Sequence, residues 1–223
     1  MLILQIFTDL VKRYLEEPFS TLYLDISSGH NIYISAVIEA GRLFSTFTNL
    51  QHLGSKEKAP KIFITFSEPI RPNYDGPYKV FTDYAFETKA FYHYPLLPTT
   101  SNLKDAYTIH AKDVSIEIAD GNRAFKNKLN EILSHGYFFY SALKNNTPLV
   151  LYFWEHHPAE SIETFLKEIN NLVIKKLSTN YLNVHINNID LIKKVYLCLS
   201  LYLGIVRILR ERTIKPKAEV NLR

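Results

Sequence analysis

Apolar positions along the first half of the chain alternate between helical and strand-like spacing. Leu2–Glu16 repeats apolar residues every three or four positions, which predicts a helix that ends before Pro18. The run TLYLDI at 21–26 predicts a buried strand, and Ile32–Phe47 returns to helical spacing. The run KIFITF at 61–66 predicts a second strand. Strand, helix and strand in this order predict a βαβ unit with parallel strands and a right-handed crossover.

The second half of the chain has a different pattern. Tyr78–Tyr94 is rich in aromatic and β-branched residues, which favours one or two further strands at a sheet edge. Helical spacing then extends over three segments, Asn122–Asn145, Ser161–Ser178 and Asp190–Arg212. The short apolar run Thr147–Trp154 fits either a strand or buried coil. We therefore expect an α/β fold in which a Rossmann-like parallel sheet is followed by a mainly α-helical domain.

A polar stretch with two prolines, at residues 95–102, separates these halves. We expect an α/β domain over residues 1–112, and a helical connector domain with a basic C-terminal tail over residues 113–223.

Composition restricts the class of protein. The chain has 223 residues, of which 47% are hydrophobic, so it can bury a substantial core and is not typical of disordered or collagen-like sequences. Its one cysteine, Cys198, permits neither an intrachain disulfide nor a multi-thiolate zinc site, which favours a reducing, cytoplasmic location. The longest apolar run, Val195–Val206, is shorter than the roughly 20 residues of a membrane-spanning helix and predicts a buried helix. No secretory signal is evident at Met1–Leu15, and we expect no membrane partner.

The net charge of +4 is concentrated at the C-terminus. Residues 207–223 hold six Lys or Arg and two Glu, whereas the remainder of the chain is neutral. This distribution favours a solvated or partner-facing tail, and it leaves open a nucleic-acid-binding helical protein that uses this tail.

The most informative segment is the predicted turn between the first strand and the second helix. Such a turn directs backbone N–H groups and the positive end of the helix dipole toward one point, which suits an anion. Gly29 permits close approach of a ligand to the backbone, while serine hydroxyls, His30 and Asn31 can donate hydrogen bonds. Asn31 also fits a helix cap. The candidate ligand-binding residues are Ser27, Ser28, Gly29, His30 and Asn31.

The same residues also fit an ordinary strand-to-helix turn, because serine, glycine and asparagine are what such turns prefer. The segment is neither a P-loop, because it lacks Gly-Lys-Ser/Thr, nor a GxGxxG dinucleotide motif.

The sequence DISSGHN at 25–31, preceded by LYL and followed by an apolar helix, resembles the D-x-T-H-G-x-N signature of CRISPR-associated Rossmann-fold (CARF) proteins of type III CRISPR systems. The match keeps Asp25, Gly29 and Asn31, replaces the Thr of the signature by Ser27, and replaces its His by Ser28. Phe66–Phe81 resembles the loop and hairpin that follow the next strand in this family.

The resemblance implies an antiviral defence protein: a homodimeric sensor that binds a cyclic oligoadenylate second messenger across its two-fold axis. By position, Ser27, Ser28, Gly29 and Asn31 would face the ligand, and Asp25 would shape the loop. A carboxylate directed at phosphates would repel them, which agrees with a structural role for Asp25. No further cofactor is implied.

Two departures from the family bear on activity. Only about twenty residues precede the motif strand, so we expect a partial CARF domain, truncated at its N-terminus. The signature of the HEPN ribonucleases fused to many CARF domains, Arg followed after four to six residues by His, does not occur, so the effector that would contact RNA is expected to be missing or separately encoded. Two enzymatic alternatives stay open: slow cleavage of the ring, and the remnant of a ligand-activated endoribonuclease.

Histidines outside this turn give no catalytic or metal assignment. WEHHPAE at 154–160 lacks the HExxH spacing and a cysteine partner, so a polar surface turn is the better interpretation. Five others lack a nearby nucleophile or carboxylate in sequence and are expected to be structural or exposed; they are His52, His93, His110, His135 and His185.

Overall fold

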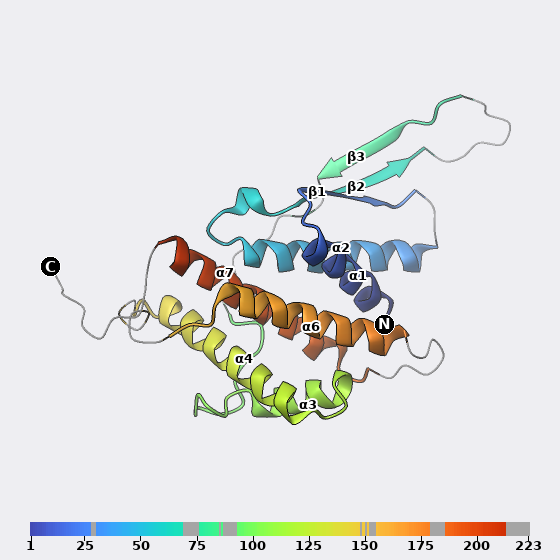
Figure 1. Cartoon of the computed structure of the whole chain (residues 1–223). Helices are drawn as coiled ribbons and strands as arrows, with labels where there is room; N and C mark the ends of the chain where they lie inside the picture. Colours follow the sequence, from blue (N-terminus) through green and yellow to red (C-terminus); the bar gives the residue numbers. More distant parts are fainter. Residues whose placement is uncertain are drawn as a thin grey trace.

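The computed structural model describes residues 1–27, 30–68, 76–84, 86, 93–147, 149, 151, 155–178 and 186–212. Three strands and six α-helices lie within this part of the chain. In chain order they are α1 (Leu2–Glu16), β1 (Thr21–Asp25), α2 (Asn31–Gln51), β2 (Lys61–Ser67), β3 (Val80–Tyr84), α3 (Thr108–Ile118), α4 (Arg123–Lys144), α6 (Ala159–Ser178) and α7 (Ile189–Glu211), with a 3₁₀ turn at Lys56–Lys58 (Figure 1).

The α/β expectation is confirmed: a small sheet with its crossover helix comes first, and the remainder is mainly helical. The sheet has the order β1-β2-β3. β1 and β2 pair in parallel, with Asp25 opposite Thr65, as the βαβ pattern predicted.

The third strand, whose direction the sequence left open, makes the sheet mixed: β3 runs antiparallel to β2, with Phe66 opposite Phe81. Parallel neighbours require a crossover, usually helical, of a dozen or more residues. The connection between β2 and β3 carries three prolines, which are incompatible with a helix interior. The chain therefore reverses direction and β3 joins as an antiparallel edge strand.

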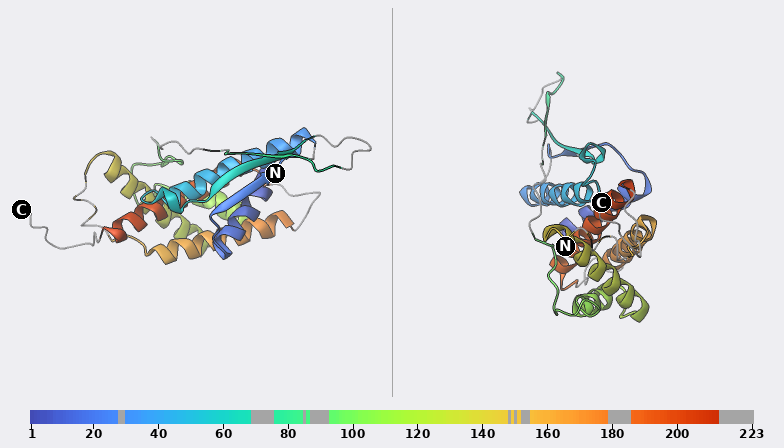
Figure 2. Two further views of the ribbon diagram at one scale, coloured as in Figure 1. Left: turned by 90° about the horizontal axis from the view of Figure 1, so that it is seen from above. Right: turned by 90° about the vertical axis from the view of Figure 1, so that its left-hand side faces the viewer.

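All of the described helices lie on one side of the sheet (Figures 1 and 2). α2 packs directly beneath it, where Leu24 and Ile62 are buried. A Cβ on Gly41 of α2 would lie 2.4 Å from Cδ1 of Leu24, so this glycine permits the close approach of helix to strand. On the opposite face Tyr23 stacks on Phe63 with ring centroids 5.4 Å apart, and Tyr23 is 61% exposed.

α7 occupies the centre of the helical layer and packs against α2, α4 and α6. The apolar run Val195–Val206 lies within it and is almost entirely buried, as predicted. A Cβ on Gly204 would lie 2.0 Å from the carbonyl oxygen of Leu50, so α2 and α7 are in backbone contact at this glycine. None of the helices in the described part of the chain combines the length and apolar character that spanning a bilayer requires.

The predicted helices agree with the structure to within a few residues at each end. One helix, α3, was not predicted, although its buried residues Ala111, Val114, Ser115 and Ile118 have helical spacing. Residue 112, the last of the expected α/β domain, lies inside α3, and one continuous hydrophobic core joins α1 and α2 to the later helices. The domain division stays a prediction.

Two predicted segments lie partly outside the described residues. Within Tyr78–Tyr94, β3 covers Val80–Tyr84, while residues 85 and 87–92 are not described. Most of Thr147–Trp154 is also not described, so the choice between strand and coil stays open there.

Candidate functional site

The turn between β1 and α2 lies at the carboxyl ends of the two parallel strands, where open α/β sheets bind ligands. Asp25 ends β1, and its Oδ1 accepts two hydrogen bonds from Ser27, one from the backbone N–H at 2.9 Å and one from the hydroxyl. These bonds hold the pKa of the Asp25 carboxyl below its ordinary value, the hydroxyl having the larger effect. The carboxylate is thus turned toward its own loop, an orientation that agrees with the loop-shaping role.

Ser27 also connects this loop to β2. Its Oγ accepts a hydrogen bond of 2.8 Å from the backbone N–H of Ser67, the last residue of β2. The chain of bonds therefore runs from the Asp25 carboxylate through the Ser27 hydroxyl to the backbone of the neighbouring strand. Sequence reasoning placed Ser27 among the ligand-facing residues and gave no sign of this contact, because it joins residues far apart in the chain.

α2 begins immediately after the turn. His30 is its N-cap residue and has extended backbone angles, but its side chain makes no capping hydrogen bond. Asn31 is the first residue within the helix, so it does not serve as the cap that the sequence suggested. Both side chains are exposed. The N-terminus of α2, which carries the positive end of the helix dipole, is thus uncapped by His30 and accessible.

The predicted ligand-binding residues therefore divide into three groups. Ser27 takes part in the hydrogen bonds that connect the strands, and His30 and Asn31 are exposed at the start of α2. Ser28 and Gly29 lie outside the described residues. The assignment of ligand contacts to these five residues stays a prediction.

Exposed apolar side chains surround this end of the sheet. Ile32 and Tyr33 in the first turn of α2 are 71% and 53% exposed. Phe66 and Phe81, opposite each other near the ends of β2 and β3, stack with centroids 5.2 Å apart and are also exposed. Apolar groups of this size at one edge are characteristic of a surface that contacts a ligand or a second protein.

A histidine pair lies in the helical layer, away from this turn. Nδ1 of His157 is 3.2 Å from Nδ1 of His135 and 3.1 Å from the hydroxyl of Tyr202, and its Nε2 is 3.3 Å from Oε1 of Glu131. The expectation that His135 lacks a carboxylate context is therefore wrong, because α4 brings Glu131 and His135 to the same cluster. No group of three histidine, cysteine or acidic side chains suited to a metal ion occurs among the described residues.

The basic C-terminal segment is described only to residue 212. Within it, Arg207 pairs with Glu163 and Arg210 pairs with Glu160, both on α6. These two arginines are therefore paired with α6 and are not part of an unpaired basic surface.

Comparison with known proteins gives one match. Residues 1–69 match the family model described as the CARF domain of the CRISPR system endoribonuclease Csx1. This range contains α1, β1, α2, β2 and the turn built by Asp25 and Ser27. Neither the curated proteins nor the solved structures compared with this chain gave a match. The family match and the parallel strand pair, with the turn at its carboxyl edge, together identify residues 1–69 as a CARF domain of the kind found in CRISPR systems.

Proposed function

We propose that this chain senses a cyclic oligoadenylate of a type III CRISPR system through the Ser27–Asn31 turn, and that it does so as a homodimer. Ligand binding is then relayed through the helices of the second half to a ribonuclease effector. The observation that carries this proposal is the exposed start of α2, held at the carboxyl edge of the sheet by the Asp25–Ser27–Ser67 hydrogen bonds within the CARF-matching residues.

The electrostatics of the turn suit a phosphate backbone. The backbone N–H groups at the start of α2 and the helix dipole favour an anion. Asp25 is a carboxylate within this turn, and its hydrogen bonds from Ser27 direct its negative charge into the loop. A multiply charged ring therefore requires no cluster of lysines or arginines at this site.

The exposed apolar groups beside the turn support both base recognition and dimerisation. The rings of Tyr33, Phe66 and Phe81 offer faces on which adenines can stack. A second copy of the chain would cover part of the same surface, including Ile32, and would thereby remove exposed apolar area from water. A ring bound across a two-fold axis would contact the turns of both copies.

α2 supplies a direct route to the helical layer. Its first residue follows the turn, and its last turn contacts α7 where Leu50 meets Gly204. Arg207 of α7 then donates a hydrogen bond of 3.1 Å to the carbonyl oxygen of Gln51 and pairs at 2.7 Å with Glu163 of α6. A displacement of α2 on ligand binding would therefore be transmitted through these contacts to both α7 and α6.

Titration calorimetry with cyclic tetra-adenylate and cyclic hexa-adenylate tests the proposal. We expect one of the two rings to bind with a stoichiometry of one ring per two chains. Replacing Asn31 by Ala should weaken binding by about tenfold or more, since a hydrogen bond to a charged group is lost. Ser35→Ala, an exposed position one turn further along α2, is the matched control and should bind as the unaltered protein does. Failure of the folded protein to bind either ring would refute the proposal.

A further inference from the structure

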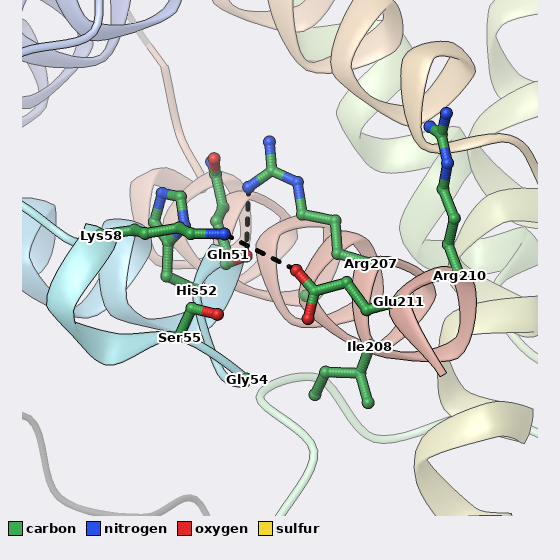
Figure 3. Close-up of a pocket in the computed structure, with 10 residues that line it drawn as sticks. Gln51, His52, Gly54, Ser55, Lys58, Arg207, Ile208, Arg210 and Glu211 are labelled. Atoms are coloured by element: carbon green, nitrogen blue, oxygen red, sulfur yellow. Dashed lines mark hydrogen bonds and ion pairs between the residues drawn. The ribbon is translucent and has the colours of Figure 1, made fainter. Parts of the chain in front are cut away.

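A cleft lies at the opposite end of α2 from the Ser27–Asn31 turn. It has a volume of about 540 Å³ and lies between the end of α2, the turn that follows it, and the last turns of α7 (Figure 3). Its walls include Gln51, His52, Ser55, Lys58 and Arg207. The volume falls within the range of small-molecule sites. A helix of 21 residues is about 30 Å long, so the two ends of α2 can bind separate ligands.

An unsatisfied hydrogen-bond donor is built into this cleft. Gln51 is 2% exposed, and its Nε2 is shielded from water without a hydrogen-bond partner among the described residues. Burying an amide donor without an acceptor costs roughly 1–3 kcal/mol, so proteins rarely leave one in place. The backbone carbonyl oxygen of the same residue accepts a hydrogen bond of 3.1 Å from the guanidinium of Arg207 (Figure 3), so a ligand bound at Gln51 would also lie near Arg207.

The other polar groups of the cleft are also mainly donors. Arg207 donates to the carbonyl oxygen of Gln51, which offsets the negative end of the α2 dipole. Burial, followed by the positive charges of Arg207 and Lys58, lowers the pKa of His52, and Glu163 and Glu211 only partly oppose this effect. Two cations, Lys58 and Arg207, thus lie close to the half-buried imidazole of His52.

The carboxylates near the cleft do not neutralise its two cations, Arg207 and Lys58, to the same extent. Glu163 holds Arg207 at 2.7 Å in a partly buried pair. By contrast, Lys58 and Glu211 are 3.8 Å apart and both are more than half exposed, a class of ion pair that contributes little. Arg210 points away from the other lining side chains in Figure 3. It pairs instead with Glu160 of α6. A ligand anion can thus replace Glu211 beside Lys58 without breaking a strong interaction.

We propose that this cleft is a second ligand site, separate from the CARF turn, which binds a small phosphate-bearing molecule. Lys58 and Arg207 bind the phosphate, and the Gln51 side chain turns toward the cleft to donate its unpaired amide hydrogen to the same ligand. Because Gln51 ends α2 and Arg207 belongs to α7, an occupant would also hold these two helices together.

Binding of ribose 5-phosphate, followed by amide NMR of the full chain, tests the site, with ribose and inorganic phosphate as separate arms. We expect ribose 5-phosphate to shift resonances of Gln51, Ser55 and Arg207, and ribose to shift none of them. Shifts with inorganic phosphate alone would show that the anion is sufficient. The absence of shifts at these residues with either phosphate compound would overturn the proposal.

Two substitutions sharpen the test. Gln51→Leu removes the unpaired donor while preserving the size of the side chain, so it should weaken binding by about tenfold without lowering the melting temperature. Lys58→Gln changes an exposed side chain, so the variant should fold normally. It should weaken binding to a similar extent. Lys12→Gln, which breaks a comparable exposed pair with Glu16, is the control. Binding that survives both cleft substitutions, or that is lost in Asn31→Ala at the CARF turn, would contradict this site.

Discussion

The hydroxyl of Ser27 joins two strands whose contacting residues are separated by 40 positions, because its Oγ accepts a hydrogen bond of 2.8 Å from the backbone N–H of Ser67. The same hydroxyl donates to Asp25 at the end of β1. Ser27 thus uses its hydrogen-bonding capacity mainly within the protein. Its contribution to ligand binding, on this geometry, is to hold the turn in position for the residues that follow it.

Replacing Ser27 by Ala should release Ser67 and leave its amide N–H without this acceptor. We expect faster hydrogen exchange at Ser67 and binding of the cyclic oligoadenylate that is about tenfold weaker, since a charge-assisted hydrogen bond and its connection to β2 are both lost. Ser27→Thr keeps the hydroxyl and is the matched control. If exchange at Ser67 is unchanged in Ser27→Ala while ligand binding is lost, then Ser27 contacts the ligand directly.

The Asp25 carboxyl reports on the same hydrogen bonds through its pKa. The Ser27 hydroxyl, followed by the Ser27 N–H, holds this pKa below the ordinary value of about 3.9. A lowered pKa in the folded state stabilises the fold at pH values above the ordinary pKa, and this stabilisation is lost as the pH falls through the folded pKa. Carbon-detected NMR titration should find the Asp25 pKa below about 3.9 and shifted upward in Ser27→Ala, where the larger cause is removed. An Asp25 pKa that is the same in both proteins would contradict this account.

Local pattern was sufficient to predict most of the architecture. Helices with a wide apolar face, such as α1 and α7, and strands with β-branched residues, such as β2, were predicted within a few residues of their observed ends. α3 was missed because its buried face includes Ala111 and Ser115, whose small side chains give a weak hydrophobic signal. The direction of β3 was left open, because strand orientation depends on pairing across the sheet rather than on the strand's own residues.

In the candidate site, too, local sequence pattern predicted some features and tertiary packing determined the others. The residues of the turn were identifiable from their types and spacing, and Asp25 was already expected to shape the loop. The contact with Ser67 and the pairing of His135 with His157 depend on tertiary packing, so no local pattern signalled them. The cleft at Gln51 was equally invisible in the sequence, because α7 supplies one of its walls.

The contact between α2 and α7 leaves no space for a side chain at Gly204. A Cβ there would lie 2.0 Å from the backbone carbonyl oxygen of Leu50, so Gly204→Ala must separate the two helices. Overpacking of this kind costs about 1–3 kcal/mol, which should appear as a lower free energy of unfolding in urea titration. Ser200→Ala, one turn earlier in α7, is the control: its buried hydroxyl has no partner among the described residues, so its removal should be neutral or stabilising. Equal stability of Gly204→Ala and the unaltered protein would show that the helices are not in close contact.

Two partly buried histidines should make the fold sensitive to mild acid. Burial is the main cause that lowers the pKa of both His52 and His135; Arg207 and Lys58 add to it at His52, and His157 adds to it at His135, where Glu131 partly opposes it. In the unfolded chain each histidine takes up a proton near pH 6.5, whereas in the folded protein it does so only at lower pH. The unfolded state therefore binds more protons within this window, and the free energy of unfolding should fall as the pH decreases from about 6.5 toward the folded pKa values.

Urea titrations at a series of pH values should show this decline in the free energy of unfolding, and His52→Gln and His135→Gln should each make it shallower. Since the two histidines contact different residues, their effects should be additive in the double variant. A decline that is equally steep in the double variant and the unaltered protein would assign the acid sensitivity to other groups.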